Sequence, residues 1–424
     1  MAPCNYEGCS ETPYGDSPWC ILHLDFPKED DPEFTRIQDE KQLKTKEKIK
    51  GGDLNFEGTN IYDVDASHVS IPAQNDADFK NATIRGWVTF DGAEIGGNAS
   101  FDGAEIGGDA RFDDAEIGGD ASFCGAKIGL GAWFDEAEIR LDAWFGGPKI
   151  ERGAWFDEAE MYDGAKKGGD ARFNGAKIGG DASFQQAEIG GDALFYRMTI
   201  GGRALFDHMT INGAYLLESA TIKADASFKD VQISKFTSLI GTSIGGSAWF
   251  DRAKIGCLRS SDEGPSSFDV ASVAGTLSFD RTQFACLEAE EAAYRAAKRN
   301  CTNRGADADA DDCFFREMVA RRKQKKQPIK SLELVVQYGL GYGACPSWLL
   351  GWWVLIAFVG AIALALASSQ WQNLGFGFAA AFVPGYGISR AQSGIAEWVA
   401  AIETIVNFFL LAAFIAVFSR RYID

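Results

Sequence analysis

The chain has 424 residues and a formal net charge of −19, with 48 glycines, 11 prolines, nine cysteines and three histidines. So few prolines exclude a low-complexity disordered chain. Residues 51–285 hold 37 acidic and 20 basic residues and carry −17 of the charge. Such a surface repels nucleic acid, so we expect no direct nucleic-acid ligand. No nucleophile–base pair or open metal site stands out, which predicts a protein that is not an enzyme.

Residues 1–24 contain a set of metal-ligating side chains. Three thiolates and one imidazole form a closed tetrahedral zinc site, and this segment offers them as Cys4, Cys9, Cys20 and His23. Cys20 and His23 are three residues apart, so a single turn brings both to one ion. We therefore predict a structural zinc module, and the alternative is four unrelated residues in a floppy terminus. Residues 25–50 are highly charged, as in a linker or a short charged helix.

Residues 51–285 carry an internal repeat of 11 residues, A-x-F-x-x-A-x-I-G-G-D. Its phenylalanines are Phe79, Phe90, Phe101, Phe112, Phe123, Phe134, Phe145 and Phe156. Its isoleucines are Ile84, Ile95, Ile106, Ile117, Ile128, Ile139 and Ile150. Alternating steps of five and six residues fit neither a helix nor an ordinary strand. We expect a solenoid that turns a corner after each short face, with each large residue and the alanine two positions before it pointing inward.

Details of the repeat give further expectations. The Gly-Gly pairs allow the positive φ angles that corners need. After Phe156 the steps change, and Met161, Lys167 and Phe173 follow as inward positions, so we expect a bulge or a snorkelling side chain at Lys167. From Phe79 to Ile255 the pattern predicts about eight coils, or about 39 Å of stacked strands.

The repeat resembles the pentapeptide-repeat proteins, in which a small residue stands two positions before a large central one. The resemblance covers more than half of the chain. It implies a mainly β fold, a right-handed, four-sided β-helix.

Residues 286–330 predict a helical hairpin that caps the open end of the solenoid. Cys286–Thr302 has helical spacing, Gly305 interrupts it, and a second helix starts in the acidic run DADADD. A basic collar follows, with Arg321, Arg322, Lys323, Lys325, Lys326 and Lys330. Such a cluster fits the anionic head groups on the cytoplasmic side of a bilayer.

Residues 331–424 predict a membrane domain. Leu334–Ser389 lacks Asp, Glu, Lys and Arg over 56 positions. It contains one span, Ser347–Ala367, whose 21 residues reach about 31 Å as a helix. Ile395–Phe418 is the second span. Basic residues flank both outer ends, which places both termini in the cytoplasm. Leu374–Gly387 is too short to cross and reads as a re-entrant segment.

Two spans around a half-helix resemble the pore unit of two-transmembrane potassium channels. The family's selectivity filter resembles five consecutive residues here: Val383, Pro384, Gly385, Tyr386 and Gly387. The resemblance implies a filter of backbone carbonyls from four chains, around a monovalent cation such as potassium. In the second span Glu403 and Asn407 share one helix face, either lining the pore or bracing the loop. The alternative for both is hydrogen bonding between helices.

These patterns predict a membrane ion channel, a homotetramer whose cytoplasmic β-helix regulates the pore or binds other proteins. The alternative is an acidic β-helix scaffold or nucleic-acid mimic that is anchored in the membrane without conduction. The start of the chain, MAPCNYEGC, lacks the apolar region of a secretory signal. We therefore expect the plasma (inner) membrane as location, and reduced cysteines that favour metal binding over disulfides.

Overall fold

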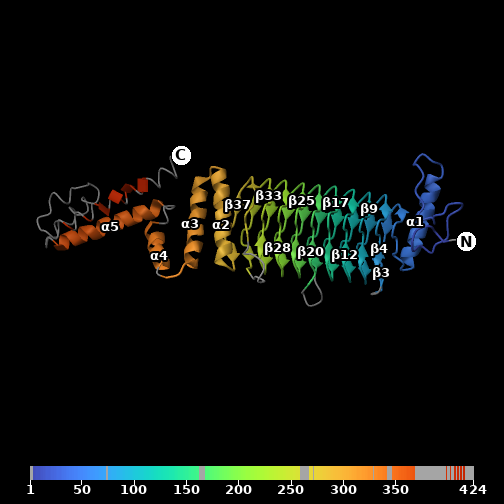
Figure 1. Ribbon diagram of the computed structural model, residues 1–424, viewed down its shortest axis with the longest axis horizontal. Coiled ribbons are helices and arrows are strands. Elements are labelled where there is room, and N and C mark those ends of the chain that lie inside the picture. The colour runs from blue at the N-terminus through green and yellow to red at the C-terminus, as the bar shows by residue number, and fades with distance from the viewer. Residues whose placement is uncertain are drawn as a thin grey trace. The chain divides into compact units, whose positions relative to one another are not determined.

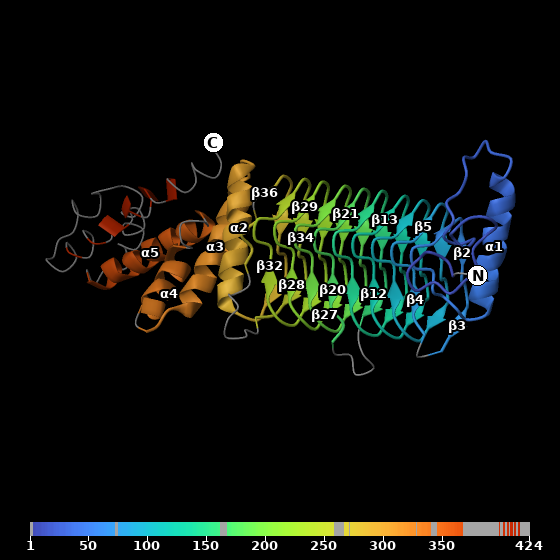
Figure 2. The same cartoon turned by 45° about the vertical axis from the view of Figure 1, so that its right-hand side comes forward.

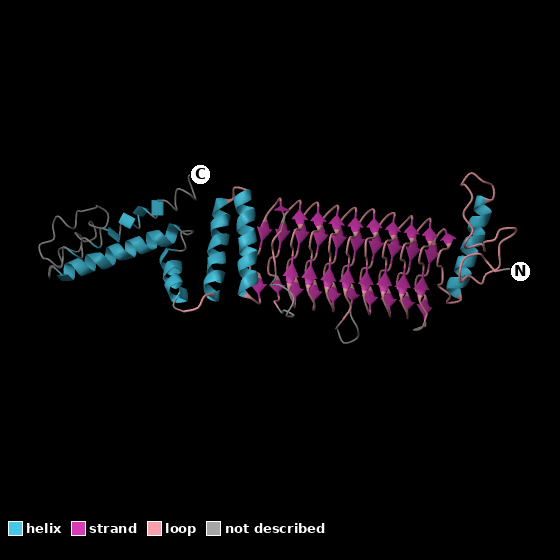
Figure 3. Cartoon of the chain, viewed as in Figure 1, coloured by secondary structure: helices cyan, strands magenta, loops and turns pink. Residues whose placement is uncertain are grey.

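The computed structural model describes residues 3–72, 75–161, 168–257, 267–270, 272–327, 329–340 and 346–367, together with single positions between 398 and 415. The chain divides into two compact units, Met1–Ala296 and Ala297–Asp424. The first unit is mainly β, and the described part of the second is helical (Figures 1 and 3).

The first unit is a parallel β-solenoid of about nine turns, built from two-residue strands (Figure 2). Four parallel sheets run along it, and each is named here after its first strand. The β1 sheet contains β1 (Asn60–Ile61), β5 (Thr83–Ile84), β9 (Glu105–Ile106), β13 (Lys127–Ile128), β17 (Lys149–Ile150), β21 (Lys177–Ile178), β25 (Thr199–Ile200), β29 (Thr221–Ile222), β33 (Ser243–Ile244) and β36 (Ser272–Val273). The β2 sheet contains β2 (Val64–Asp65), β6 (Val88–Thr89), β10 (Ala110–Arg111), β14 (Ala132–Trp133), β18 (Ala154–Trp155), β22 (Ala182–Ser183), β26 (Ala204–Leu205), β30 (Ala226–Ser227), β34 (Ala248–Trp249) and β37 (Leu277–Ser278).

The other two sheets complete each coil. The β3 sheet contains β3 (Ser70–Ile71), β7 (Glu94–Ile95), β11 (Glu116–Ile117), β15 (Glu138–Ile139), β19 (Glu160–Met161), β23 (Glu188–Ile189), β27 (Thr210–Ile211), β31 (Gln232–Ile233), β35 (Lys254–Ile255) and β38 (Gln283–Phe284). The β4 sheet contains β4 (Ala77–Asp78), β8 (Ala99–Ser100), β12 (Ala121–Ser122), β16 (Ala143–Trp144), β20 (Ala171–Arg172), β24 (Ala193–Leu194), β28 (Tyr215–Leu216) and β32 (Thr237–Ser238).

The core explains the 11-residue period. Successive phenylalanines alternate between two columns, one beside the β2 sheet and one beside the β4 sheet, so one coil takes two periods. Within a column the rings stack, as Phe101 and Phe123 do at 4.8 Å between centroids. Between columns the rings meet edge to face, as Phe112 and Phe123 do at 5.5 Å and 87°. These rings and the alanines two residues before them are fully buried, which confirms the predicted inward positions.

The Gly-Gly corners have a different cause from the one predicted. A Cβ atom on Gly107 would lie 2.1 Å from the carbonyl oxygen of Arg85, one coil earlier. The coils are therefore too close at this corner for any side chain. In most coils of the described residues, positive φ angles occur instead at the corner after the phenylalanine, as at Gly103 (+67°) and Asn81 (+56°); the pair Gly168 (+80°) and Gly169 (+69°) is an exception.

Aspartate follows many of the Gly-Gly pairs, and it links successive coils. Oδ1 of Asp120 accepts a hydrogen bond of 2.9 Å from the backbone N–H of Asp142, 22 residues later. Asp142 in turn accepts one of 2.8 Å from Asp170. Sequence reasoning assigned no structural role to these acids, because their partner is a backbone amide without a sequence signal. Charge-assisted bonds of this kind contribute about 1.5–3 kcal/mol each.

The coil in which a bulge or a snorkelling Lys167 was predicted is longer than its neighbours. Ala171 pairs with Ala143, and the ring of Phe173 stacks on Phe145 at 4.7 Å. Phe173 is therefore equivalent to Phe145, and this coil contains six extra residues, 28 instead of 22 between equivalent positions. Lys167 itself lies outside the described residues. The steps of five and six misled the sequence analysis because an insertion of six residues preserves them.

A helix covers the first coil of the solenoid. Helix α1 (Phe34–Lys50) contacts β1 and β2 and buries Ile37, Lys41 and Ile49. The Nζ of Lys41 donates to the carbonyl oxygens of Leu24 and Asn60 and lies 4.5 Å from the centre of the Phe26 ring. Residues 34–50 are thus a packed cap rather than a linker.

The last coil is covered by the first half of α2 (Leu287–Asn303). Ala289 and Ala293 are fully buried, and the ring of Tyr294 lies 6.3 Å from Phe279 and 6.2 Å from Phe284. The predicted helix Cys286–Thr302 is therefore present, shifted by one residue, and its first half covers the last coil. In the second unit, Nζ of Lys298 donates to Glu317 at 2.7 Å, between the end of α2 and α3 (Asp307–Gln324).

Two further helices follow in the second unit. Helix α4 (Ile329–Leu340) contacts α3 and α5 (Pro346–Ala367), and α5 coincides with the first predicted span. Over the described residues, no helix has the combination of length and apolar character that crossing a membrane requires. Most of the second predicted span, Ile395–Phe418, lies outside the described residues.

Candidate metal centre

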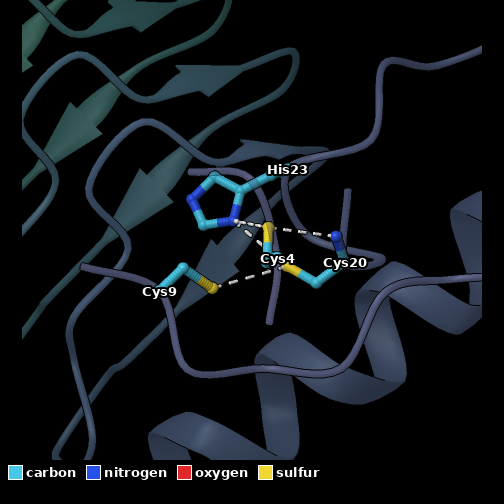
Figure 4. Close-up of side chains that lie close together, drawn as sticks. All are labelled: Cys4, Cys9, Cys20 and His23. Carbon is cyan, nitrogen blue, oxygen red and sulfur yellow. Dashed lines mark hydrogen bonds between the residues drawn. The ribbon is translucent and has the colours of Figure 1, made fainter. Parts of the chain in front are cut away.

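The four predicted ligands come together beside the first coil (Figure 4). Their ligand atoms all lie within 4.8 Å of one another, and Cys4 and Cys20 are buried. Backbone hydrogen bonds hold the loops, since the N–H of Cys4 donates to Glu11 and the N–H of Cys9 to Tyr6, at 3.0 and 3.1 Å. Gly8 lies in that turn at φ +85°, which favours glycine.

The distances between ligand atoms suit a tetrahedral ion. Thiolates bound to zinc at about 2.3 Å lie about 3.8 Å apart. The sulfurs of Cys9 and Cys20 are 3.9 Å apart, and Nδ1 of His23 lies 3.6 Å from the sulfur of Cys4 and 3.1 Å from that of Cys20. The cluster can therefore hold a metal ion through three sulfurs and Nδ1.

His23 is oriented by two groups that the sequence gave no reason to choose. Its Nε2 lies 3.0 Å from the carbonyl oxygen of Glu57, so an Nε2–H donates there and leaves Nδ1 free as a ligand. The ring of Tyr6 stacks on the imidazole at 4.2 Å and 9°. Because Glu57 precedes the first strand, this hydrogen bond also connects the metal loops to the solenoid.

The thiols differ in acidity. For Cys4, burial opposes ionisation, but hydrogen bonds from the backbone of Tyr6 and Cys20 and from the other thiols bring its pKa down to about 7. Burial raises the pKa of Cys9 to about 12 and also raises that of Cys20. A dication would supply the charge that three thiolates at this distance need. With four protein ligands no position is left for water, so such a site is structural.

The predicted pore residues cannot be placed in the same way. All seven lie outside the described residues: Val383, Pro384, Gly385, Tyr386, Gly387, Glu403 and Asn407. Their roles remain predictions.

A disulfide was missed by the sequence analysis, which expected reduced cysteines. Cys257 follows β35, Cys286 directly precedes α2, and the two are bonded with their Cα atoms 5.8 Å apart. The bridge encloses the last coil. Only the coil geometry brings these two residues together, so their separation of 29 residues gave no signal.

The fold defines a parallel β-solenoid protein. Comparison with known families adds that residues 74–116 and 90–138 match the family model described as pentapeptide repeats (9 copies). The solenoid thus contains pentapeptide repeats, as its resemblance implied. No curated protein and no solved structure matches the chain significantly.

Proposed function

We propose that the chain is a subunit of a homotetrameric cation channel whose β-solenoid regulates the pore or binds other proteins. The supporting observation is the surface of α5. Six large apolar side chains of this helix are 38–62% exposed: Trp352, Val354, Leu355, Phe358, Val359 and Leu366. An aqueous solvent disfavours so many large apolar side chains on one helix, whereas lipid accepts them.

The proposed membrane domain comprises Ser347–Ala367, Ile395–Phe418 and the re-entrant segment between them. Exposed bases on α3, among them Arg321 and Lys323, suit anionic head groups on the cytoplasmic side. Four copies would place Val383–Gly387 around a path for a monovalent cation, with Glu403 and Asn407 nearby. The location would be the plasma (inner) membrane, with both termini in the cytoplasm.

Two finer proposals belong to the solenoid. We infer right-handed, four-sided winding from the likeness to pentapeptide repeats. We also infer that Cys4, Cys9, Cys20 and His23 bind structural zinc, because their donor set and spacing suit it. The proposal includes no enzymatic activity, because the sequence shows no nucleophile–base pair and no open metal site.

The chain offers a matched pair of variants to test conduction. It contains Gly-Tyr-Gly twice, at Gly341–Gly343 and at Gly385–Gly387, and the proposal gives a filter role to the second alone. In single-channel recordings of purified protein in lipid, Gly385→Ala is expected to abolish or alter the current, and Gly343→Ala to preserve it. Particle mass should correspond to four chains.

The alternative is an acidic scaffold anchored in the membrane, or a nucleic-acid mimic, as the −17 charge of residues 51–285 favours. Absence of current with any monovalent cation, combined with a monomeric or dimeric particle, would replace the channel by this scaffold. Equal effects of the two glycine variants would also count against the filter.

A further inference from the structure

Two tryptophans form a stacked pair on the outside of the solenoid. Trp133 on β14 and Trp155 on β18 occupy equivalent outward positions on consecutive strands of the β2 sheet. Their ring centroids are 3.9 Å apart with an angle of 15° between the planes, and both side chains are partly exposed. The preceding strand presents Arg111 at this position and the following strand presents Ser183.

The pair replaces a stabilising feature of the repeat. The corner two residues before this position carries Asp109 one coil earlier and Asp181 one coil later, and each accepts a backbone hydrogen bond from the next coil. The two coils with tryptophan carry Gly131 and Gly153 there instead. A Cβ atom on Gly131 would lie 2.8 Å from Trp155 and 2.9 Å from Trp133, and one on Gly153 would lie 2.5 Å from Trp155. The indoles therefore occupy the corner where Asp109 and Asp181 stand in the adjoining coils, and two links of the carboxylate ladder are absent. Solenoid stability alone does not account for this exchange.

Two other tryptophans of the solenoid, Trp144 and Trp249, lie against cations. The guanidinium of Arg172 lies 4.0 Å from the centre of the Trp144 ring and forms ion pairs with Asp142 and Asp170. On the β2 sheet, Nζ of Lys229 lies 5.0 Å from the Trp249 ring. Arg111 lies 5.9 Å from Trp133 and pairs with Asp91 and Asp113. Trp155 has no such cation among the described residues, because the next strand offers Ser183.

We propose that Trp133 and Trp155 bind an arginine side chain of a basic partner protein. A guanidinium stacks on an indole and pairs with carboxylates at the same time, as Arg111 does beside Trp133 with Asp91 and Asp113, which are equivalent to Asp135 and Asp157 in earlier coils. Asp135 and Asp157 follow the two tryptophans by two residues, and the net charge of −17 over residues 51–285 steers a basic segment toward this surface. Tryptophan and arginine are also the residues most enriched where binding energy concentrates in interfaces. The site does not depend on whether the chain conducts ions.

The test uses the full-length protein in detergent and three synthetic peptides of equal length, which carry arginine, lysine or the uncharged arginine analogue citrulline between glycines. Calorimetry is expected to give the tightest binding for the arginine peptide. Trp155→Ser copies the residue of the next strand, and we expect it to weaken arginine-peptide binding at least tenfold. Trp249→Ser is the matched control, at the same position of the same sheet, and is expected to leave binding within twofold.

Several outcomes would overturn the proposal. Equal binding of the arginine and lysine peptides, unaffected by Trp155→Ser, would mean general attraction to an acidic surface. An equal loss in Trp249→Ser would remove the special role of the pair. If Trp155→Ser does not fold, as judged by circular dichroism, Trp155→Leu keeps an apolar cover over the glycine corner, and unchanged binding by that variant contradicts the proposal equally.

Discussion

The two ends of the solenoid meet the same physical problem with different chemistry. A stack of coils leaves its phenylalanine column and the edges of four sheets uncovered at each end. At the first coil, α1 covers them, fixed by buried Lys41 and by the candidate metal centre. At the last coil, the first half of α2 covers them, fixed by the Cys257–Cys286 disulfide. The comparison teaches that each cap is held by an additional cross-link. A chelator should therefore loosen the first coil, and a reductant should loosen the last coil.

The largest expected effect is at the first coil. Cys20→Ser removes a sulfur close to both Cys9 and His23, so we expect loss of the proposed zinc ion and of hydrogen-exchange protection in α1. Structural zinc contributes about 10–16 kcal/mol of apparent free energy in small modules. Zinc content by mass spectrometry of the native protein checks the first point. Cys124→Ser on the side of the solenoid is the control and should keep the metal, and a wild-type protein without metal would contradict the prediction.

Opening the disulfide should loosen the other end. Cys257→Ser with Cys286→Ser is expected to lower the local free energy of unfolding by about 2–5 kcal/mol, because the bridge restricts the unfolded chain around the last coil. Hydrogen exchange should rise in β36, β37, β38 and the first half of α2, while α1 keeps its protection. A uniform rise along the solenoid would show that the two ends are not independent.

Lys41 gives the first cap a pH dependence. Burial lowers the pKa of Lys41 to about 7, despite the opposing charges of Asp25 and Cys20. Between pH 7 and about 10.5 the unfolded chain therefore holds a proton that the folded chain has released, so folding becomes more favourable as pH rises. We expect the wild type to gain stability over this range relative to Lys41→Met.

At pH 7 the same Lys41→Met substitution leaves the carbonyl oxygens of Leu24 and Asn60 without a donor, which should cost about 1–3 kcal/mol. Thermal unfolding of both proteins at several pH values measures both effects. Parallel stability curves for wild type and variant would mean that Lys41 does not titrate in this range.

The smallest effect is expected in the middle of the solenoid. Gly125 has a φ of +70° and open space around its Cα, so Gly125→Ala should cost about 1–2 kcal/mol through backbone strain alone. Gly125→Asn should cost less, since Asn81 already adopts this conformation at the equivalent corner. Chemical denaturation of the two variants ranks them, and equal losses would mean that space rather than conformation limits this corner.

The solenoid core could be predicted from the sequence because every coil repeats the same inward residues. The metal ligands could be predicted because cysteine and histidine are common metal ligands and occur here at a spacing typical of zinc sites. Contacts to the backbone could not: the carbonyl of Glu57 that orients His23, and the carbonyl of Arg85 that excludes a side chain at Gly107, belong to residues of any type. Predicting the Cys257–Cys286 disulfide would have required the path of the last coil, which brings the end of β35 next to the start of α2.

The extra six residues before Ala171 have a practical consequence. The rings of Phe145 and Phe173 stack at 4.7 Å across that coil, as closely as those of uninterrupted coils. A corner therefore accommodates additional chain without disturbing the packing on either side. Foreign peptides could be grafted at this point. The regular spacing of the neighbouring coils would then define the position of the inserted peptide along the solenoid.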